Sequence, residues 1–328
     1  MSMQLRASMV TTLAIIIGLS TLVFTVALSL LDAFSFLTLA IFVVGFNLIQ
    51  WLIGPYIVNA MYRVREVSRV ERPELYDIVE RISQRAKISM PKVMIANIPI
   101  PNAFAYGSPL TGTRIAVTDG LLRTLEPGEV EAVLGHELGH IKHNDVQVMM
   151  FVSVLPSLLY YIGYTLMYSS SSSGNNKRGN NAALLGEVSI GLYFVLTLLS
   201  LQLSRLREYY ADRHSAQVVD DGAHKLSVAL AKIVTYTSQM GRGRMGRSQM
   251  GQVSNVKAFS NFKTLFIADP DTAAKDAAEV QMMRGGSDQD LVQRVLLRKV
   301  STFDSFVEIF STHPNIVKRL RALQSLQQ

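Results

Sequence analysis

The sequence contains no cysteine and few charged residues, and both features narrow what the protein can be. Without cysteine the chain forms no disulfide, thiolate metal site or cysteine nucleophile, so any metal must be held by His, Asp or Glu. Charged residues make up 17% of the 328 residues and hydrophobic residues 49%, whereas a soluble enzyme usually has about 25% charged residues. The composition therefore favours a membrane protein.

The net charge of +7 has two interpretations, a nucleic-acid surface or basic residues that face anionic lipid. The apolar composition favours lipid. The segment 239–263 contains three arginines among glycines but no interleaved aromatic residues, so we expect no nucleic-acid partner. This segment is interpreted as a solvated insertion, with a mobile lid or a lipid-facing loop as alternatives.

Four apolar stretches approach or exceed the 20 or so residues that a helix needs to cross a bilayer. They are residues 10–31, 34–58, 146–168 and 182–203. Asp32 is the only charged residue between positions 10 and 58, so residues 1–58 are predicted to form a transmembrane hairpin that turns there. Residues 146–203 are predicted to form a second hairpin, with a flexible Ser/Asn/Gly-rich loop at 169–181. For this second pair the alternative is two buried helices of a soluble core.

Basic residues gather on one side of the predicted spans. They follow the second span at Arg63, Arg65, Arg69 and Arg72, and the fourth at Arg205 and Arg207. Because basic residues concentrate on the cytoplasmic side, we expect both termini and the polar segments 59–145 and 204–328 to be cytoplasmic. The protein is thus expected to be a multi-pass protein of the cell membrane, with its catalytic segments in the cytoplasm.

Residues 135–140 read Gly-His-Glu-Leu-Gly-His, within a segment that favours a helix starting near Pro127. Four residues along a helix return to nearly the same face about 6 Å further on, so His136 and His140 can share one metal ion. Glu137 lies partly on that side and can act as general base on a water molecule. The alternative is an amphipathic helix with surface histidines.

A catalytic zinc site has three protein ligands and one open position. His140 lies six residues before the third span and Glu208 five residues after the fourth, so an antiparallel hairpin makes them neighbours. Asp212, four residues after Glu208, can accept a hydrogen bond from a ligand imidazole. The alternative for Glu208 is a simple ion pair with Arg205 or with a lipid-side cation. A fourth ligand would close the open position, so His143 is expected at the surface or behind the ligands.

The HELGH motif, the following membrane hairpin and the E-x-x-x-D pattern resemble the HtpX family of membrane zinc metalloproteases, which is related to the CAAX prenyl endoproteases. Further similar stretches are 101–105 (Pro-Asn-Ala-Phe-Ala), 114–118, Asp145, 311–314 (Ser-Thr-His-Pro) and Arg319. The resemblance runs from the first span to Arg319, and segment 239–263 has no counterpart in it.

This resemblance implies a mostly α membrane protein (α+β) with four transmembrane helices and a cytoplasmic zincin-like domain that contains a small β-sheet. It implies one Zn²⁺ per chain, held by His136, His140 and Glu208, with Glu137 as base and Asp212 behind the ligands. The implied activity is cleavage of misfolded or damaged membrane proteins on the cytoplasmic side, in membrane quality control and stress response. Expected partners are polypeptide substrates and the lipid bilayer; the sequence carries no signal for an oligomeric state.

Two further residues are candidates for the reaction. Asn102 can hydrogen-bond the substrate backbone or the oxyanion, or it can initiate a turn after Pro101. His313 can donate to the oxyanion, or it can cap or pack against the predicted helix 315–323. The alternation in 103–106 and 115–117 predicts a hairpin whose edge can take up an extended substrate as an added strand. His214 and His224 are expected to be exposed.

Two other functions remain as alternatives. A structural zinc site would bind the metal without activity, and His143 would complete its ligand shell. A transporter would need polar residues in mid-membrane. Glu187 is the only charged residue well inside a predicted span, and it lies near an end, which disfavours transport.

Overall fold

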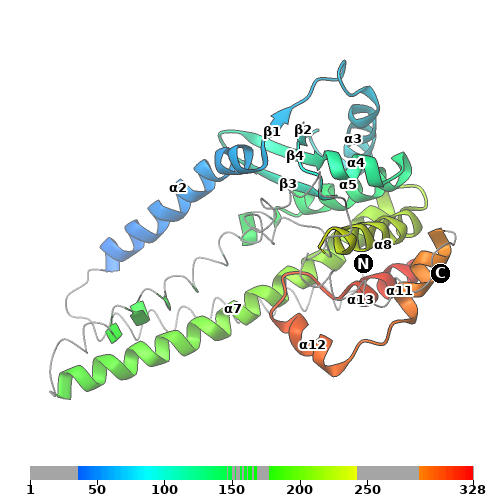
Figure 1. Cartoon of the computed structure of the whole chain (residues 1–328). Coiled ribbons are helices and arrows are strands. Elements are labelled where there is room, and N and C mark those ends of the chain that lie inside the picture. The colour runs from blue at the N-terminus through cyan, green and yellow to red at the C-terminus, as the bar shows by residue number, and fades with distance from the viewer. Residues whose placement is uncertain are drawn as a thin grey trace. The chain divides into compact units, whose positions relative to one another are not determined.

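The computed structural model describes residues 36–145, 147–149, 152, 156, 159–160, 162–164, 166–167, 177–241 and 288–327. These fall into two compact units, one from the described residues of 1–53 and 147–206, the other from those of 54–146 and 207–328 (Figure 1). Two long helices, α2 (Phe36–Tyr62) and α7 (Lys177–Val218), contribute to both units.

In the first unit, the described residues between 147 and 167 are helical and run antiparallel to α7. The rings of Tyr160 and Tyr193 lie 5.5 Å apart. The backbones approach closely where Gly163 meets Ile190 and where Gly186 meets Met167. Small residues at such crossings let two helices pack tightly without a large apolar core. The arrangement is that of a helical hairpin.

By length and composition, one helix of the described part of the chain can cross a membrane, the portion Ala183–Val218 of α7. Only 17% of its most apolar window is buried in the protein. Large apolar side chains on it, such as those of Leu184, Val188 and Phe194, are exposed. A mostly unburied apolar helix suits contact with lipid better than a place in a soluble core.

Some of the predicted spans lie within the described residues and others do not. Span 10–31 lies outside the described residues, and span 146–168 is described only at scattered positions. Span 182–203 lies within α7 and most of 34–58 within α2. The predicted loop 169–181 is wrong at its end, because α7 already begins at Lys177. Residues 177–181 contain no proline and only one glycine, so they can continue the helix. The four-span arrangement stays a prediction.

The second unit contains a four-stranded sheet made of β1 (Val64–Glu66), β2 (Lys92–Ala96), β3 (Ala103–Ser108) and β4 (Gly112–Thr118). The strand order is β1-β2-β4-β3, with β2 and β4 parallel and the other two pairs antiparallel. The predicted hairpin is confirmed as β3–β4, and Gly112 at its turn has a φ of 68°, which favours glycine. This order puts β3 at an edge of the sheet.

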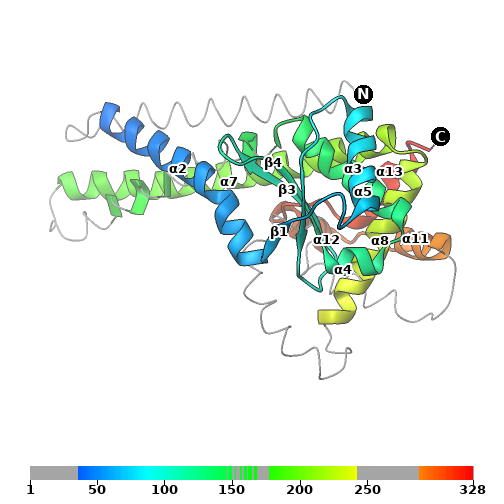
Figure 2. The same cartoon turned by 90° about the horizontal axis from the view of Figure 1, so that it is seen from above.

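Helices of this unit pack on the sheet and on one another (Figures 1 and 2). They are α3 (Pro73–Ala86), α4 (Asp119–Thr124), α5 (Pro127–Lys142), α8 (Gly222–Gly241), α11 (Asp288–Leu297) and α13 (Ile316–Gln324). The short helix α12 (Thr302–Ile309) lies between α11 and α13 in the sequence. Helix α5 contacts β3 and β4 on one side and α8 on the other, and α8 in turn contacts α11 and α13. Fully buried side chains fill the core from sheet to C-terminal helix, among them Ile115, Val133, Leu138, Leu226 and Leu320.

The start of α5 is the one that the sequence predicts. Pro127 occupies the first turn, where its missing N–H costs no hydrogen bond. Glu126 and Glu129 form a reciprocal capping box, in which the Glu126 backbone N–H donates to Glu129 Oε2 at 3.0 Å. These contacts fix the start of the helix that carries the HELGH motif, nine residues before its first histidine.

Helices α5 and α7 approach closely at two glycines of the motif helix. A Cβ atom on Gly139 would lie 3.1 Å from both Ala211 Cα and His214 Cβ, and one on Gly135 would lie 2.9 Å from a Val219 methyl. The Ser215 hydroxyl donates to the Ala132 carbonyl at 2.6 Å across the same contact. The lack of a side chain at these positions lets the two helices meet.

Gly139→Ala should therefore destabilise the protein, although alanine favours helix more than glycine. We expect a loss of about 1–3 kcal/mol, because the added methyl group meets backbone and Cβ atoms of α7. The control is Gly128→Ala on the same helix, where the nearest atoms belong to the flexible Lys225 side chain at 3.4 Å or more. The measurement is thermal unfolding in detergent. A melting temperature for Gly139→Ala equal to that of Gly128→Ala would contradict this account of the contact.

Candidate metal centre

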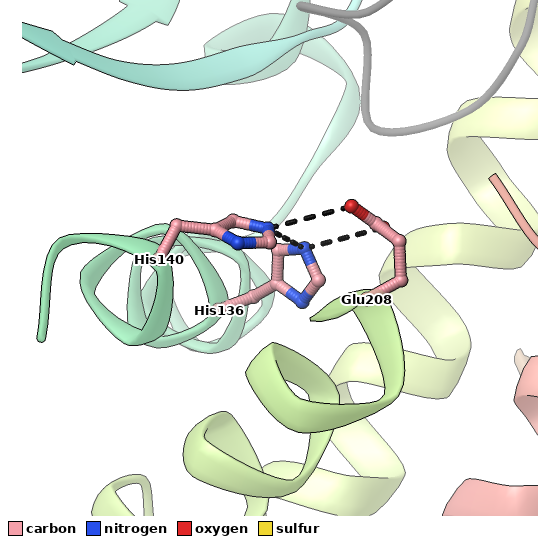
Figure 3. Close-up of side chains that lie close together, drawn as sticks. All are labelled: His136, His140 and Glu208. Carbon is pink, nitrogen blue, oxygen red and sulfur yellow. Dashed lines mark hydrogen bonds and ion pairs between the residues drawn. The ribbon is translucent and has the colours of Figure 1, made fainter. Parts of the chain in front are cut away.

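His136 and His140 lie one turn apart on α5 and turn their Nε2 atoms toward each other. These two atoms are 3.1 Å apart, and the rings are nearly perpendicular (Figure 3). His136 is buried and His140 nearly so. As the sequence predicts, the spacing of four residues directs both imidazoles toward one point.

Glu208 reaches the same point from α7 (Figure 3). Its Oε1 lies 3.5 Å from His140 Nε2, and its Oε2 lies 3.6 Å from His136 Nε2. All three ligand atoms lie within 4.8 Å of one another. Ligand atoms of a tetrahedral zinc site, bonded at 2.0–2.2 Å, are about 3.3 Å apart, so the donor set has the spacing of a metal site.

The other nitrogen of each imidazole faces a carboxylate. His136 Nδ1 lies 2.9 Å from Asp212 Oδ1, and His140 Nδ1 lies 2.6 Å from Asp145 Oδ2. These contacts favour a proton on each Nδ1, which leaves the lone pairs of both Nε2 atoms pointing at each other. Two lone pairs at 3.1 Å repel unless a cation lies between them. The residues present therefore fit a metal ion.

The buried charges lead to the same conclusion. Three carboxylates, those of Asp145, Glu208 and Asp212, are accompanied by the guanidinium groups of Arg207 and Arg319. One negative charge is left in excess around the two histidines, before Glu137 is considered. A buried charge without compensation is costly, and a divalent cation at this position would compensate it.

Arg319 links the third ligand to its neighbour on α7. Its Nη1 lies 3.1 Å from Glu208 Oε2, and its Nε and Nη2 contact the two oxygens of Asp212 at 2.9 and 2.5 Å. Although burial lowers the pKa of Arg319, the carboxylates of Asp212 and Glu208 raise it above its ordinary value. Glu208 thus meets a cation from α13, 111 positions further along the chain, and remains a carboxylate.

Glu137 lies beside the three predicted ligands and faces the sheet. It is buried, and its Oε2 accepts a hydrogen bond from the Ala105 N–H at 3.1 Å. Burial raises the pKa of Glu137 to about 7, although the imidazole of His140 and the hydrogen bond from Ala105 oppose the rise. A carboxyl group with a pKa near neutrality can both accept and return a proton. Ala105 belongs to the edge strand β3, so this carboxylate sits between the sheet edge and the ligands.

His313 and Asn102 are placed differently. The loop before α13 brings His313 Nε2 to 3.7 Å from Glu208 Oε1, and His313 Nδ1 lies 2.9 Å from the Thr312 hydroxyl. Asn102 is buried, and its backbone N–H and carbonyl both bond to Thr118, which anchors the start of β3. His313 therefore adjoins the centre, and the catalytic roles of both residues stay predictions.

The sequence interpretation is wrong for His214. Its side chain is buried between α7 and α5, with Nδ1 3.0 Å from the Gly135 carbonyl oxygen. The available signal was helical spacing, because His214 follows the buried Ala211 by three residues and precedes the buried Val218 by four. His143 is exposed as expected, and its ring packs on Tyr210 at 4.7 Å. The sequence indicates Arg207 only as a basic residue after the fourth predicted span, although it directly precedes Glu208 and its side chain is buried.

The chain matches known peptidases over most of its length. Residues 69–327 match the profile of peptidase family M48. It is 40% identical over 295 residues to the protease HtpX homolog of Thermoplasma acidophilum, a match that covers 88% of this chain and 84% of that protein. It is 37% identical over 329 residues to protease HtpX homolog 2 of Saccharolobus solfataricus, with 95% of each covered.

A solved structure shares the fold. The crystal structure of S. mikatae Ste24p matches with a TM-score of 0.50 and 17% sequence identity, over 98% of this chain and 67% of that one. At this identity the likeness concerns the arrangement of the chain alone.

The three predicted ligands can be tested through the stability that metal binding adds. A ligand present at 100 times its Kd stabilises the folded state by about 2.7 kcal/mol. We expect zinc to raise the melting temperature of the chelator-treated protein, and Glu208→Gln to abolish that rise because it removes the only charged ligand. Glu129→Gln, which alters a buried carboxylate near the start of α5, should keep the rise. An undiminished rise in Glu208→Gln would exclude Glu208 as a ligand.

Proposed function

Because the chain belongs to peptidase family M48 and is a metallopeptidase similar to HtpX proteases, we propose that it is a membrane-bound zinc endopeptidase. The observation that carries the proposal is the convergence of His136, His140 and Glu208 beside the carboxylate of Glu137. The long, mostly unburied apolar helix α7 supports the membrane location.

The donor set of two imidazoles and one carboxylate suits zinc among the common metals. When bound by His136, His140 and Glu208, zinc supplies a Lewis acid that activates water and polarises the scissile carbonyl. Three side chains form the group found among the described residues, and His143 packs on Tyr210. A three-ligand set keeps a position open for chemistry, which favours a catalytic over a structural site.

Glu137 is the proposed general base. Its carboxylate takes a proton from the attacking water and passes that proton to the leaving amine. The Ala105 N–H holds Oε2 at 3.1 Å, which fixes the carboxylate at the end of the sheet that faces the ligands. Burial excludes competing water and raises the pKa of Glu137 to about 7, which suits a group that must both accept and release a proton.

The strand β3 is the proposed binding edge for substrate. It is the outermost strand next to β4, so its free side can accept an extended polypeptide as an added strand. A chain aligned on β3 passes the position of Glu137, because Ala105 of that strand contacts Glu137 directly. Main-chain recognition of this kind suits a protease that accepts many sequences, as the removal of damaged proteins requires.

His313 and Asn102 are proposed to align the substrate and stabilise the oxyanion. The Thr312 hydroxyl can donate to His313 Nδ1, which leaves the proton on Nε2, the nitrogen that faces the centre. A donor there can bond to the charge that develops on the scissile carbonyl. Asn102 stands at the start of β3, where its side chain can meet the substrate backbone.

The proposed substrates are misfolded or damaged membrane proteins, cleaved on the cytoplasmic side in membrane quality control and stress response. The cytoplasmic side is supported by the basic residues that follow the second and fourth predicted spans, which favour a cytoplasmic location for the catalytic segments 59–145 and 204–328. The proposal includes four membrane spans, at 10–31, 34–58, 146–168 and 182–203, and cytoplasmic termini.

Glu137→Gln should abolish cleavage while zinc stays bound. Loss of a general base typically costs 10²- to 10⁴-fold in rate, so we expect casein degradation by the detergent-solubilised protein to fall by at least about a hundredfold. The control is Glu131→Gln, because Glu131 lies on the same helix but pairs with Arg81 away from the ligands. Degradation that Glu137→Gln leaves at the wild-type rate, or that continues in chelator, would sink the proposal.

His313→Ala should lower kcat by about 10²- to 10³-fold, the usual cost of removing one oxyanion donor. Zinc content should be unchanged, because His313 faces Glu208 from outside the ligand set. The two measurements are casein degradation and bound zinc by atomic absorption. Loss of zinc from the folded variant would instead make His313 a ligand, and an unchanged kcat would remove it from the mechanism.

A further inference from the structure

The outer nitrogen of His140 begins a chain of buried polar contacts that leads back to α7. His140 Nδ1 lies 2.6 Å from Asp145 Oδ2. The other oxygen of that carboxylate, Oδ1, accepts a short contact from Arg207 Nη2. Arg207 is the residue directly before the proposed third ligand, Glu208. Two ligands that come from different helices are thus joined through Asp145 and Arg207.

The backbone is bent to make this contact. In a continuous helix, residue 145 would lie about 140° around the axis from His140 and could not meet its ring. Helix α5 ends at Lys142, and Asn144 adopts a φ of 54°, the left-handed region that asparagine tolerates better than most residues. This turn brings Asp145 back under the imidazole of His140.

The burial of the pair shows that it is more than a surface ion pair. Asp145 is 7% exposed and Arg207 4% exposed. A buried carboxylate and a buried guanidinium are each costly alone and are tolerated only because they neutralise each other. Asp145 can accept the Nδ1 proton of His140, and Arg207 compensates the charge of Asp145 in this buried surrounding.

A similar series of polar contacts surrounds the other histidine, His136. Asp212 lies 2.9 Å from His136 Nδ1, and Arg319 holds both oxygens of Asp212. The two chains have the same order of imidazole, carboxylate and guanidinium but arise from different segments. The arrangement for His136 uses α7 and α13, whereas that for His140 uses the turn after α5 and the residue that precedes Glu208.

We propose that Asp145 and Arg207 are a positioning pair for the metal centre. Asp145 orients His140 and fixes its proton on Nδ1, and Arg207 holds Asp145 while it fixes the position of the Glu208 backbone relative to α5. Neither residue contacts the metal or the substrate. The inference rests on the proposed zinc site at His136, His140 and Glu208.

The test measures zinc affinity rather than activity. The full chain carrying Glu137→Gln, which cannot digest itself, is compared in detergent with the same chain carrying Asp145→Asn, Arg207→Gln, or both. Zinc Kd is measured by competition with a chromophoric chelator, and the visible spectrum of the cobalt-substituted protein reports the ligand geometry. The matched control is Glu129→Gln, since Glu129 is also a buried carboxylate of this region and pairs with Lys232 at 2.6 Å.

We expect Asp145→Asn to weaken zinc binding by about 10- to 100-fold, the usual cost of losing the hydrogen-bond partner of a metal-bound histidine. Arg207→Gln should cost about tenfold. The double variant should be no worse than Asp145→Asn, because Arg207 acts through Asp145 and the two losses are not additive. The cobalt spectrum should shift in all three variants, and Glu129→Gln should change neither readout.

Each other outcome overturns the inference. A zinc Kd within twofold of the parent in Asp145→Asn or in the double variant would show that the pair is only structural, even if the melting temperature falls. Each single variant leaves one buried charge without its partner, whereas the double variant leaves none and is therefore expected to fold. If the loss of zinc affinity in the double variant equals the product of the two single losses, the two residues act independently and the inference is wrong. If the parent chain itself binds no zinc, the proposed function fails together with the inference.

Discussion

The contact between Arg319 and the two carboxylates of α7 is the interaction on which the rest of the centre depends. Glu208 and Asp212 are both buried and one helical turn apart, so their charges repel in surroundings that contain little water. Arg319, itself only 2% exposed, neutralises that repulsion by contacting both. Because Asp212 in turn holds His136, one guanidinium connects α13, α7 and α5. The motif helix alone therefore does not make the candidate site, which is complete only when the C-terminal helix packs on it.

The same region shows how steric and electrostatic requirements are met together. Helices α5 and α7 must come close for Glu208 to face the two imidazoles, and Gly139 permits this because it presents no side chain to Ala211. Close approach buries polar groups, and each of these then needs a partner. Ser215 bonds to the Ala132 carbonyl and His214 to the Gly135 carbonyl, although the latter atom already takes part in α5. The tight contact and the buried hydrogen bonds thus follow from one constraint. Helix α7 must lie close enough to α5 for Glu208 to face His136 and His140.

The local parts of this arrangement could be predicted from sequence. Helical periodicity pairs His136 with His140 and Glu208 with Asp212, and a short connection between two long apolar stretches implies the antiparallel contact seen between residues 160–167 and α7. The partners of the buried charges could not be predicted in this way. Arg319 is 107 positions from Asp212, and no spacing rule relates such distant residues. Arg207 is 62 positions from Asp145 and, as one of several basic residues after an apolar stretch, was interpreted only as part of a cytoplasmic charge cluster. The burial of His214 was missed because the apolar spacing of α7 was not followed past Asp212.

The carboxylate beside each imidazole is held by a different part of the chain, and this affects how the centre forms. The support of His140 comes from the turn that directly follows α5 and from the residue beside Glu208, so it is complete once α5 and α7 meet. The support of His136 is complete only when α13 also arrives, because Asp212 depends on Arg319. Without Arg319, Asp212 and Glu208 lack the guanidinium that offsets the repulsion between their charges. Burying both carboxylates at these positions is then costly, so the packing of α7 against α5 is favourable only when α13 is also in place. The C-terminal helix therefore completes the arrangement of the candidate centre.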